Sequence, residues 1–109
     1  MATLGDAVER SRDLGAAAIE LHTGQYAHAS ANPATLRALR DASARGAAIG
    51  LAVHAGHGLT VENVGPVAAI PEIEELNIGH AVVSRAIFIG LANTVHELRA
   101  AMDAARRLS

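Results

Sequence analysis

The chain has 109 residues, half of them hydrophobic, with nine arginines, no lysine, no cysteine and a net charge of −2. This length predicts one domain, and the lack of clustered basic charge argues against a nucleic-acid partner. Without cysteine, disulfides and cysteine-bound metals are excluded, and we expect a reducing, cytoplasmic location. No apolar run approaches the roughly 20 residues of a membrane-spanning helix, so we expect no membrane partner.

Hydrophobic periodicity and turn residues divide the chain into alternating helices and strands. Asn32 and Pro33 form a typical helix start, because asparagine caps a helix and proline suits its first position. Gly46 is expected to end that helix, and Gly65 with Pro66 to allow only a short helix further on. We predict helices over residues 4–14, 33–45, 81–88 and 91–105, and a short helix within residues 60–70. We predict strands over residues 17–22, 50–54 and 75–78, so that strands and helices alternate along most of the chain.

Strands that alternate with helices indicate parallel βαβ units. Three parallel strands leave both edges of a sheet unpaired, and a complete (β/α)₈ barrel needs about 250 residues. We therefore predict an α/β fold in which residues 1–109 form a single partial domain. It corresponds to about three βα units and the terminal helix at the C-terminal end of a TIM (β/α)₈ barrel.

Polar residues stand near the carboxyl ends of the predicted strands, where barrel enzymes hold their active sites. In the first strand, Glu20 and His22 share one face and Ile19 and Leu21 share the other, because successive strand residues alternate sides. We expect the aliphatic face to meet the helices and the polar face to line a barrel interior. The side chains expected to gather at the strand ends are Glu20, His22, His54, His57 and His80.

His57 is the histidine most typical of a catalytic site, because it lies between Gly56 and Gly58. Glycines let the backbone approach a ligand closely, and imidazole is the usual proton-transfer group near neutral pH. Glu20, which has apolar neighbours, is a second candidate, with a solvated or paired edge carboxylate as the alternative. We interpret His22 and His54 as hydrogen-bonded supports of the site, and His28 and His96 as surface residues.

Gly79 and His80 follow the third predicted strand and open a helix. Free backbone N–H groups at a helix start bind anions, and barrels often hold a phosphate after strands seven and eight. These two residues are therefore a candidate phosphate site, with a plain strand-to-helix turn as the alternative. His54 and His57 are three residues apart, but there is no HExxH pattern, so we expect no metal.

Three longer motifs occur in order: IELHTGQYA at 19–27, VHAGHGLTVENV at 53–64 and IPEIEELNIGHAVVSRAI at 70–87. Together they resemble the C-terminal half of the pyridoxine 5′-phosphate synthase family, over essentially the whole chain. The resemblance implies condensation of 1-deoxy-D-xylulose 5-phosphate with 3-amino-2-oxopropyl phosphate to give pyridoxine 5′-phosphate, inorganic phosphate and water. It also implies homo-oligomers and no metal or organic cofactor.

Matching these motifs position by position, the resemblance implies that His57 is a proton donor and that Glu20 stabilises the transition state. It implies that Gly58, Gly79 and His80 bind 3-amino-2-oxopropyl phosphate. The family's other catalytic histidine and glutamate lie on early strands, which we expect to precede this sequence. Two alternatives stay open, a non-catalytic phosphate-binding half-barrel or degenerate fragment and another phosphosugar barrel. In the latter, a Schiff-base lysine is excluded because the sequence has no lysine.

Overall fold

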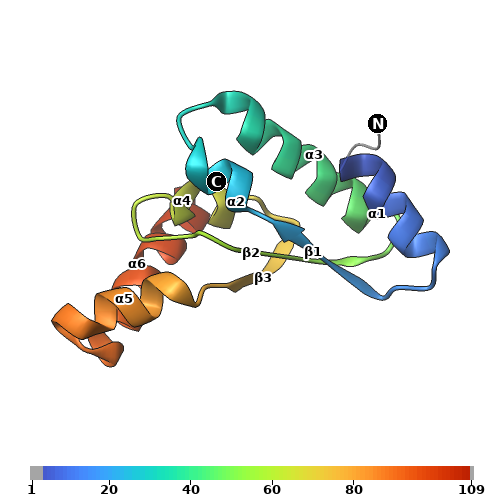
Figure 1. Ribbon diagram of the computed structural model, residues 1–109. Coiled ribbons are helices and arrows are strands. Elements are labelled where there is room, and N and C mark those ends of the chain that lie inside the picture. The colour runs from blue at the N-terminus through green and yellow to red at the C-terminus, as the bar shows by residue number, and fades with distance from the viewer. Residues whose placement is uncertain (1–3, 109) are drawn as a thin grey trace.

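A computed structural model describes residues 4–108 and contains a parallel three-stranded sheet with the strand order β1–β2–β3 (Figure 1). The strands are β1 (Ala18–His22), β2 (Ala52–Gly56) and β3 (Ile73–Asn77). The helices are α1 (Leu4–Asp13), α2 (Gly24–His28), α3 (Pro33–Ala48), α4 (Val64–Ala68), α5 (His80–Ile89) and α6 (Leu91–Leu108). The predicted α/β class, with strands that alternate with helices, is confirmed.

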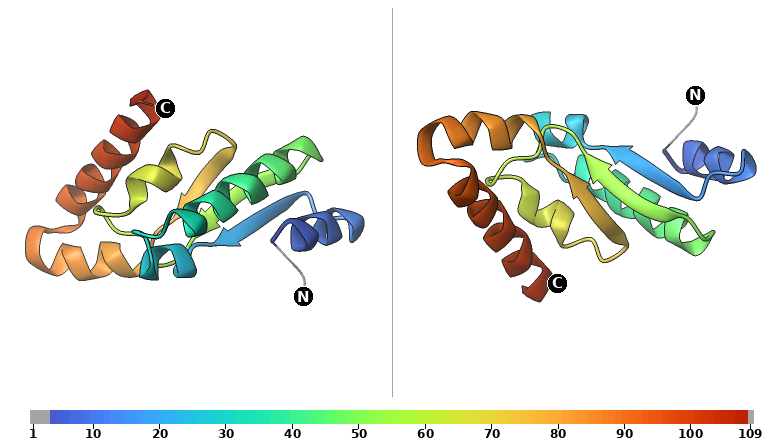
Figure 2. Two further views of the ribbon diagram at one scale, coloured as in Figure 1. Left: turned by 90° about the horizontal axis from the view of Figure 1, so that it is seen from above. Right: turned by 90° about the horizontal axis from the view of Figure 1, so that it is seen from below.

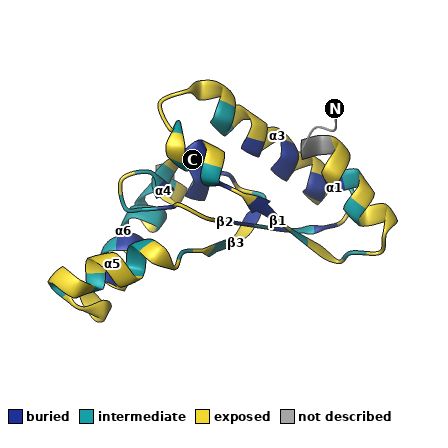
Figure 3. Ribbon diagram, in the orientation of Figure 1, coloured by how far each residue is buried: buried dark blue, intermediate teal, exposed yellow. Residues whose placement is uncertain are grey.

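The two faces of the sheet differ sharply in polarity. On one face the register places Ile19, Val53 and Ile73 side by side, and helix α3 packs over β1 and β2. Figure 3 shows buried residues on the strands and on the side of α3 that meets them. On the other face the register joins Glu20 to His54 and His54 to Glu75, and these side chains are exposed or half-buried. The polar face therefore lies opposite the helices, as the alternation of residues along the strands predicts.

The hydrophobic core lies between the sheet and the helices on its apolar face. Its largest fully buried aliphatic side chains come from β2, β3, α4 and the loops beside α4, and they are Val53, Leu59, Val64, Val67, Ile70 and Ile73. Val8 of α1 and Leu98 of α6 extend the same cluster. The loop that follows β2 therefore contributes a buried side chain, Leu59, to the same core as the strand.

Two predicted helix features are present. The side chain of Asn32 accepts the backbone N–H of Ala34 at 3.0 Å and caps α3, as its sequence predicts. Gly65 and Pro66 fall inside α4, which has only five residues. Pro66 is tolerated because it lies in the first turn, where a backbone N–H has no partner within the helix.

The predicted end of α3 at Gly46 is wrong, because the helix continues to Ala48. Gly46 is buried, and a Cβ atom there would lie 3.1 Å from side-chain atoms of both Ile19 and Val53. The glycine lets α3 approach the sheet closely, so its reason is tertiary packing rather than helix termination. Gly50, with φ +89°, makes the turn after this helix.

Strand β1 agrees with the prediction to within one residue, whereas β2 and β3 each begin two residues away from their predicted starts. Strand β2 begins at Ala52 rather than Gly50, since the backbone N–H of Leu51 still bonds to α3. Strand β3 begins at Ile73 rather than Glu75, because Ile73 is a buried core residue that pairs with β2. Helix α2, directly after β1, was not predicted.

Helices α5 and α6 pack against each other and extend beyond the end of the sheet (Figure 2). Helix α5 has no buried residue, and large apolar side chains on this pair are exposed: Val83, Ile87, Phe88, Leu91 and Val95. The described residues extend over 44 × 28 × 26 Å, an elongated shape. Over residues 4–108, none of the helices is long and apolar enough to cross a membrane.

Candidate functional site

The carboxyl ends of the three strands lie at one edge of the sheet, because the strands are parallel. The register pairs His22 with Gly56 and Gly56 with Asn77 at this edge. Residues far apart in sequence therefore come together where the strands end. The predicted site residues lie at or near the edge, with Glu20 within β1, His57 and Gly58 directly after β2, and Gly79 and His80 shortly after β3.

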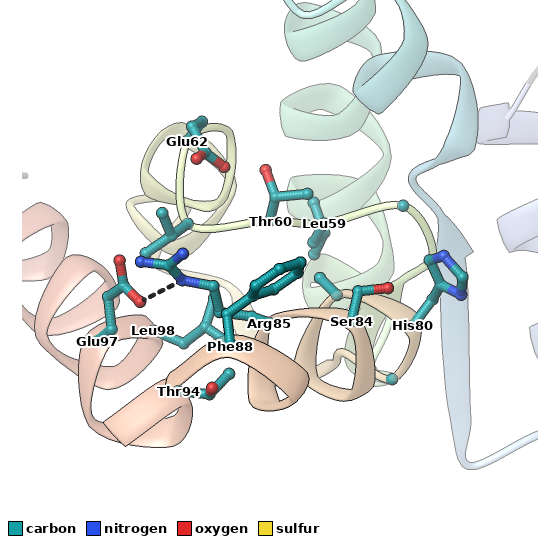
Figure 4. A pocket seen from close by; sticks show the side chains of 14 residues that line it. Leu59, Thr60, Glu62, His80, Ser84, Arg85, Phe88, Thr94, Glu97 and Leu98 are labelled. Atoms are coloured by element: carbon teal, nitrogen blue, oxygen red, sulfur yellow. Dashed lines mark hydrogen bonds and ion pairs between the residues drawn. The ribbon is translucent and has the colours of Figure 1, made fainter. Parts of the chain in front are cut away.

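A pocket of about 460 Å³ opens between the loop after β2 and helices α5 and α6 (Figure 4). Three predicted substrate-binding residues, Gly58, Gly79 and His80, line it, whereas His57 and Glu20 do not. Its volume lies in the range of small-molecule sites. The pocket is lined by Gly58, Leu59, Thr60, Val61, Glu62, Gly79, His80, Ala81, Ser84, Arg85, Phe88, Thr94, Glu97 and Leu98.

The start of α5 forms one wall of this pocket and has the geometry that is typical of anion-binding helix starts. Gly79 is the N-cap residue and makes no side-chain capping bond, so the backbone N–H groups of the first turn are not capped by it. Such groups and the helix dipole favour a phosphate. Arg85 also lines the pocket, where its positive charge is paired with the Glu97 carboxylate at 3.3 Å (Figure 4). Ser84 and Arg85 were not predicted, although helical spacing from His80 places Ser84 one turn away on the same face.

His57 lies beside this pocket in an unusual backbone conformation. Within residues 4–108 it is the one non-glycine residue with a positive φ, +105°. Such a conformation costs about 1–3 kcal/mol and persists only where the surrounding structure enforces it. The ring of His57 stacks on that of His22, with centroids 4.3 Å apart and planes inclined by 26°. The sequence placed both histidines at the strand ends but did not predict this contact.

Glu20 lies deeper along the polar face and is held by a residue that the sequence did not single out. The Asn77 side chain donates a hydrogen bond to Glu20 from β3, across the central strand. The crossing is possible because Gly56, in register with Asn77, has no side chain. Beside it, His54 lies 3.4 Å from Glu75. His54 is thus paired with Glu75 on the sheet and is not part of the stack of His22 and His57.

The loop after β2 is braced by buried side chains from the segment after β1. The Thr23 hydroxyl donates to the carbonyl oxygen of His57 at 2.6 Å, and the Tyr26 hydroxyl donates to that of Asn63 at 2.6 Å. Asn63 in turn donates to the carbonyl oxygen of Gly58 at 3.2 Å. Burial raises the pKa of the Tyr26 hydroxyl above its usual value of 10.0. Both ends of the loop are therefore tied to the first βα unit.

Metal ligands are not gathered in the described part of the chain. Over residues 4–108 no three histidine, aspartate or glutamate side chains lie close enough to hold a metal ion together. The chemistry available at the strand ends is that of imidazole, carboxylate and backbone N–H groups. The geometry therefore defines an α/β protein with a pocket of small-molecule size and a conformationally restrained histidine at its strand ends.

Comparison with known proteins identifies the family. Residues 1–104 match the family described as pyridoxal phosphate biosynthesis protein PdxJ, and the chain belongs to that family. It is 56% identical over 97 residues to the pyridoxine 5′-phosphate synthase of Thioalkalivibrio sulfidiphilus, covering 86% of this chain and 39% of the relative. It is 53% identical over 105 residues to that of Ruegeria pomeroyi, covering 91% and 42%.

A third relative gives the same picture. The pyridoxine 5′-phosphate synthase of Rhodospirillum rubrum is 53% identical over 103 residues, which covers 92% of this chain and 41% of the relative. The resemblance found in the sequence motifs is thereby confirmed. The chain spans about two fifths of the length of these relatives and matches their C-terminal part.

Proposed function

We propose that this chain forms the C-terminal part of a pyridoxine 5′-phosphate synthase and supplies one part of its active site. The family match and the relatives' names support this function. The substrates follow from the family, 1-deoxy-D-xylulose 5-phosphate and 3-amino-2-oxopropyl phosphate. They join to give pyridoxine 5′-phosphate, with release of inorganic phosphate and water.

The fold is proposed to be a segment of a TIM (β/α)₈ barrel, with residues 1–109 as one partial domain. The parallel sheet and the helices on its apolar face support this proposal. In such a barrel, further strands pair with the edges of β1 and β3, and the polar face lines the interior. Glu20, His54 and Glu75 then point toward the centre of the barrel.

The observation that carries the functional proposal is the convergence of Gly58, Gly79 and His80 on one pocket. These residues come from two segments about 20 residues apart, and in the proposal they bind 3-amino-2-oxopropyl phosphate. Backbone N–H groups at the start of α5 hold its phosphate. A fixed phosphate orients the amino ketone toward the strand ends, where the carbon chemistry takes place.

His57 and Glu20 supply the acid–base and electrostatic part of the proposed reaction. Imine formation and ring closure remove hydroxyl groups as water, and each departure needs a proton that a neighbouring imidazolium donates. His57 takes that role, next to Gly58 at the pocket edge. The Glu20 carboxylate stabilises the positive charge that develops on the substrate nitrogen. The proposal requires no metal or organic cofactor.

Self-association and cytoplasmic location are part of the same proposal. The apolar side chains exposed on α5 and α6 support a homo-oligomer, because large exposed apolar patches usually mark contact surfaces. The absence of cysteine supports a reducing compartment.

The test uses a chimera in which this chain replaces the matching C-terminal region of the Thioalkalivibrio enzyme. In it, His57→Ala should lower kcat by roughly 10²–10⁴-fold, the usual contribution of a general acid. His28→Ala, at an exposed position in α2, serves as the matched control and should leave kcat unchanged. Equal kcat values for the two variants contradict the role of His57.

Calorimetry on the 109-residue chain separates the synthase from the alternative, a non-catalytic phosphate-binding half-barrel. The pocket at the start of α5 favours binding of 3-amino-2-oxopropyl phosphate even without catalysis. Heat of binding together with an inactive chimera supports the binder. An active chimera supports the synthase.

A further inference from the structure

We propose that Thr23 is a positioning residue, which holds His57 in the backbone and ring orientation needed for proton transfer. The inference rests on the proposed function, because it concerns the residue assigned there as the proton donor. Thr23 is fully buried, directly after β1, and none of its atoms is available to a ligand. Any effect of Thr23 on the reaction must therefore act through its neighbours.

Thr23 donates two hydrogen bonds, one to each of the peptide groups on either side of the His57 Cα atom. The backbone N–H of Thr23 donates to the carbonyl oxygen of Gly56 at 3.0 Å, and its hydroxyl donates to the carbonyl oxygen of His57 at 2.6 Å. The first bond fixes the peptide plane before the His57 Cα atom, and the second fixes the plane after it. Together they determine φ and ψ of His57, the two free backbone dihedrals of a residue.

This restraint matters because the conformation is one that histidine does not adopt by itself. A φ of +105° belongs to a region where side chains other than glycine are strained. A released His57 relaxes toward negative φ, which swings its Cβ atom and ring to a different side of the loop. A threonine hydroxyl at this position therefore selects the strained conformation.

The ring orientation of His57 is completed by its contact with the residues around Thr23. The ring stacks on that of His22, whose Nδ1 accepts the backbone N–H of Gly24 at 3.2 Å. A Cβ atom on Gly24 would lie 2.5 Å from the His22 ring and 3.0 Å from the His57 ring. The segment from His22 to Gly24 thus forms one surface against which the His57 ring packs. Thr23, in the same segment, holds the backbone of His57 in the position that brings its ring to this surface.

Substitutions at Thr23 test this proposal. Thr23→Val keeps the shape of the side chain but removes the hydroxyl, and Thr23→Ser keeps the hydroxyl. The matched control is Thr35→Val, because the Thr35 hydroxyl also donates to backbone carbonyls, at the start of α3. NMR on the 109-residue chain follows the cross-relaxation between the His22 and His57 rings. Steady-state kinetics on the chimera give kcat and KM.

We expect Thr23→Val to abolish the cross-relaxation between the rings and to lower kcat roughly 10- to 100-fold, the effect of misplacing a reacting group by about 1 Å. KM should change less than about threefold, since Gly79 and His80 at the start of α5 do not depend on the Thr23 hydroxyl. Thr23→Ser and Thr35→Val should keep both the ring contact and kcat. Where Thr23→Val does not fold, as judged by circular dichroism, Thr23→Ala provides the same comparison.

Three results would overturn the proposal. The first is an intact ring contact and wild-type kcat in Thr23→Val. The second is a loss confined to KM, which would assign Thr23 to substrate binding. The third is an equal loss of kcat in Thr35→Val, which would make the effect one of general stability. If the unsubstituted chimera makes no product, the proposed function fails, and the ring comparison alone then decides whether Thr23 positions His57.

Discussion

Replacing Gly56 by alanine perturbs the point where the three strands end. A Cβ atom at this position would lie 2.7 Å from the backbone oxygen of Asn77 and 3.0 Å from its Cβ atom. Ordinary contact begins at 3.4 Å, so β3 must move away from β2 by about 0.7 Å, since the obstacle is backbone rather than a flexible side-chain end. Overpacking of this kind typically costs 1–3 kcal/mol.

The assay is urea unfolding followed by far-ultraviolet circular dichroism, because the sequence has no tryptophan and a single tyrosine. With a urea m-value of about 1–3 kcal/mol/M, we expect the midpoint of Gly56→Ala to fall by roughly 1 M. Gly65→Ala, within α4, is the control, because its Cβ atom would lie at an ordinary contact distance, 3.8 Å, from that of Ala105. It should not lower the midpoint, since alanine favours a helix by roughly 0.5–1 kcal/mol over glycine. An unchanged midpoint for Gly56→Ala would refute the argument that the strands are too close for a side chain there.

Further predictions concern three residues of the fold, Tyr26, Arg106 and Asn32. Tyr26→Phe should cost about 1–3 kcal/mol in urea unfolding, because the carbonyl oxygen of Asn63 loses its buried donor. Since burial raises the pKa of Tyr26, the wild type should lose stability as the pH rises above 10.0, where the unfolded tyrosine ionises first, and Tyr26→Phe should lack this decline. Arg106→Met should lower stability by about 1.5–3 kcal/mol, because the Arg106 guanidinium donates to three backbone carbonyls in the segment from α4 to β3. The control is Arg107→Met, whose urea midpoint should stay near that of the wild type. Asn32→Ala should cost about 1 kcal/mol by loss of the α3 cap, and an unchanged thermal midpoint would contradict the capping role.

Local sequence features predicted the parts of the fold that depend on local chemistry. Asn32 caps α3 because its side chain needs only the next turn of the chain. Alternation along β1 separated Glu20 from Ile19, and the register places them on opposite faces. Gly46 failed as a helix end because its role is set by Ile19 and Val53, which belong to other elements. A rule based on neighbouring residues cannot detect that approach.

The same division holds for the candidate site. Gly79 and His80 were found because a strand and a helix adjoin them in sequence, and the structure places them at a pocket. The stack of His22 on His57 depends on the register of β1 against β2, which periodicity does not specify. Asn77 was not predicted as a site residue for a similar reason, since its hydrogen-bond partner Glu20 lies two strands away.

The central claim is that this chain supplies one part of a pyridoxine 5′-phosphate synthase site at its strand ends. The most direct test is the rate of pyridoxine 5′-phosphate formation by the unsubstituted chimera, given 1-deoxy-D-xylulose 5-phosphate and 3-amino-2-oxopropyl phosphate. The proposal predicts a kcat within about tenfold of the Thioalkalivibrio enzyme, a difference of no more than about 1.4 kcal/mol in the activation free energy. A chimera that folds cooperatively, binds the amino ketone phosphate and yet forms no product would contradict it.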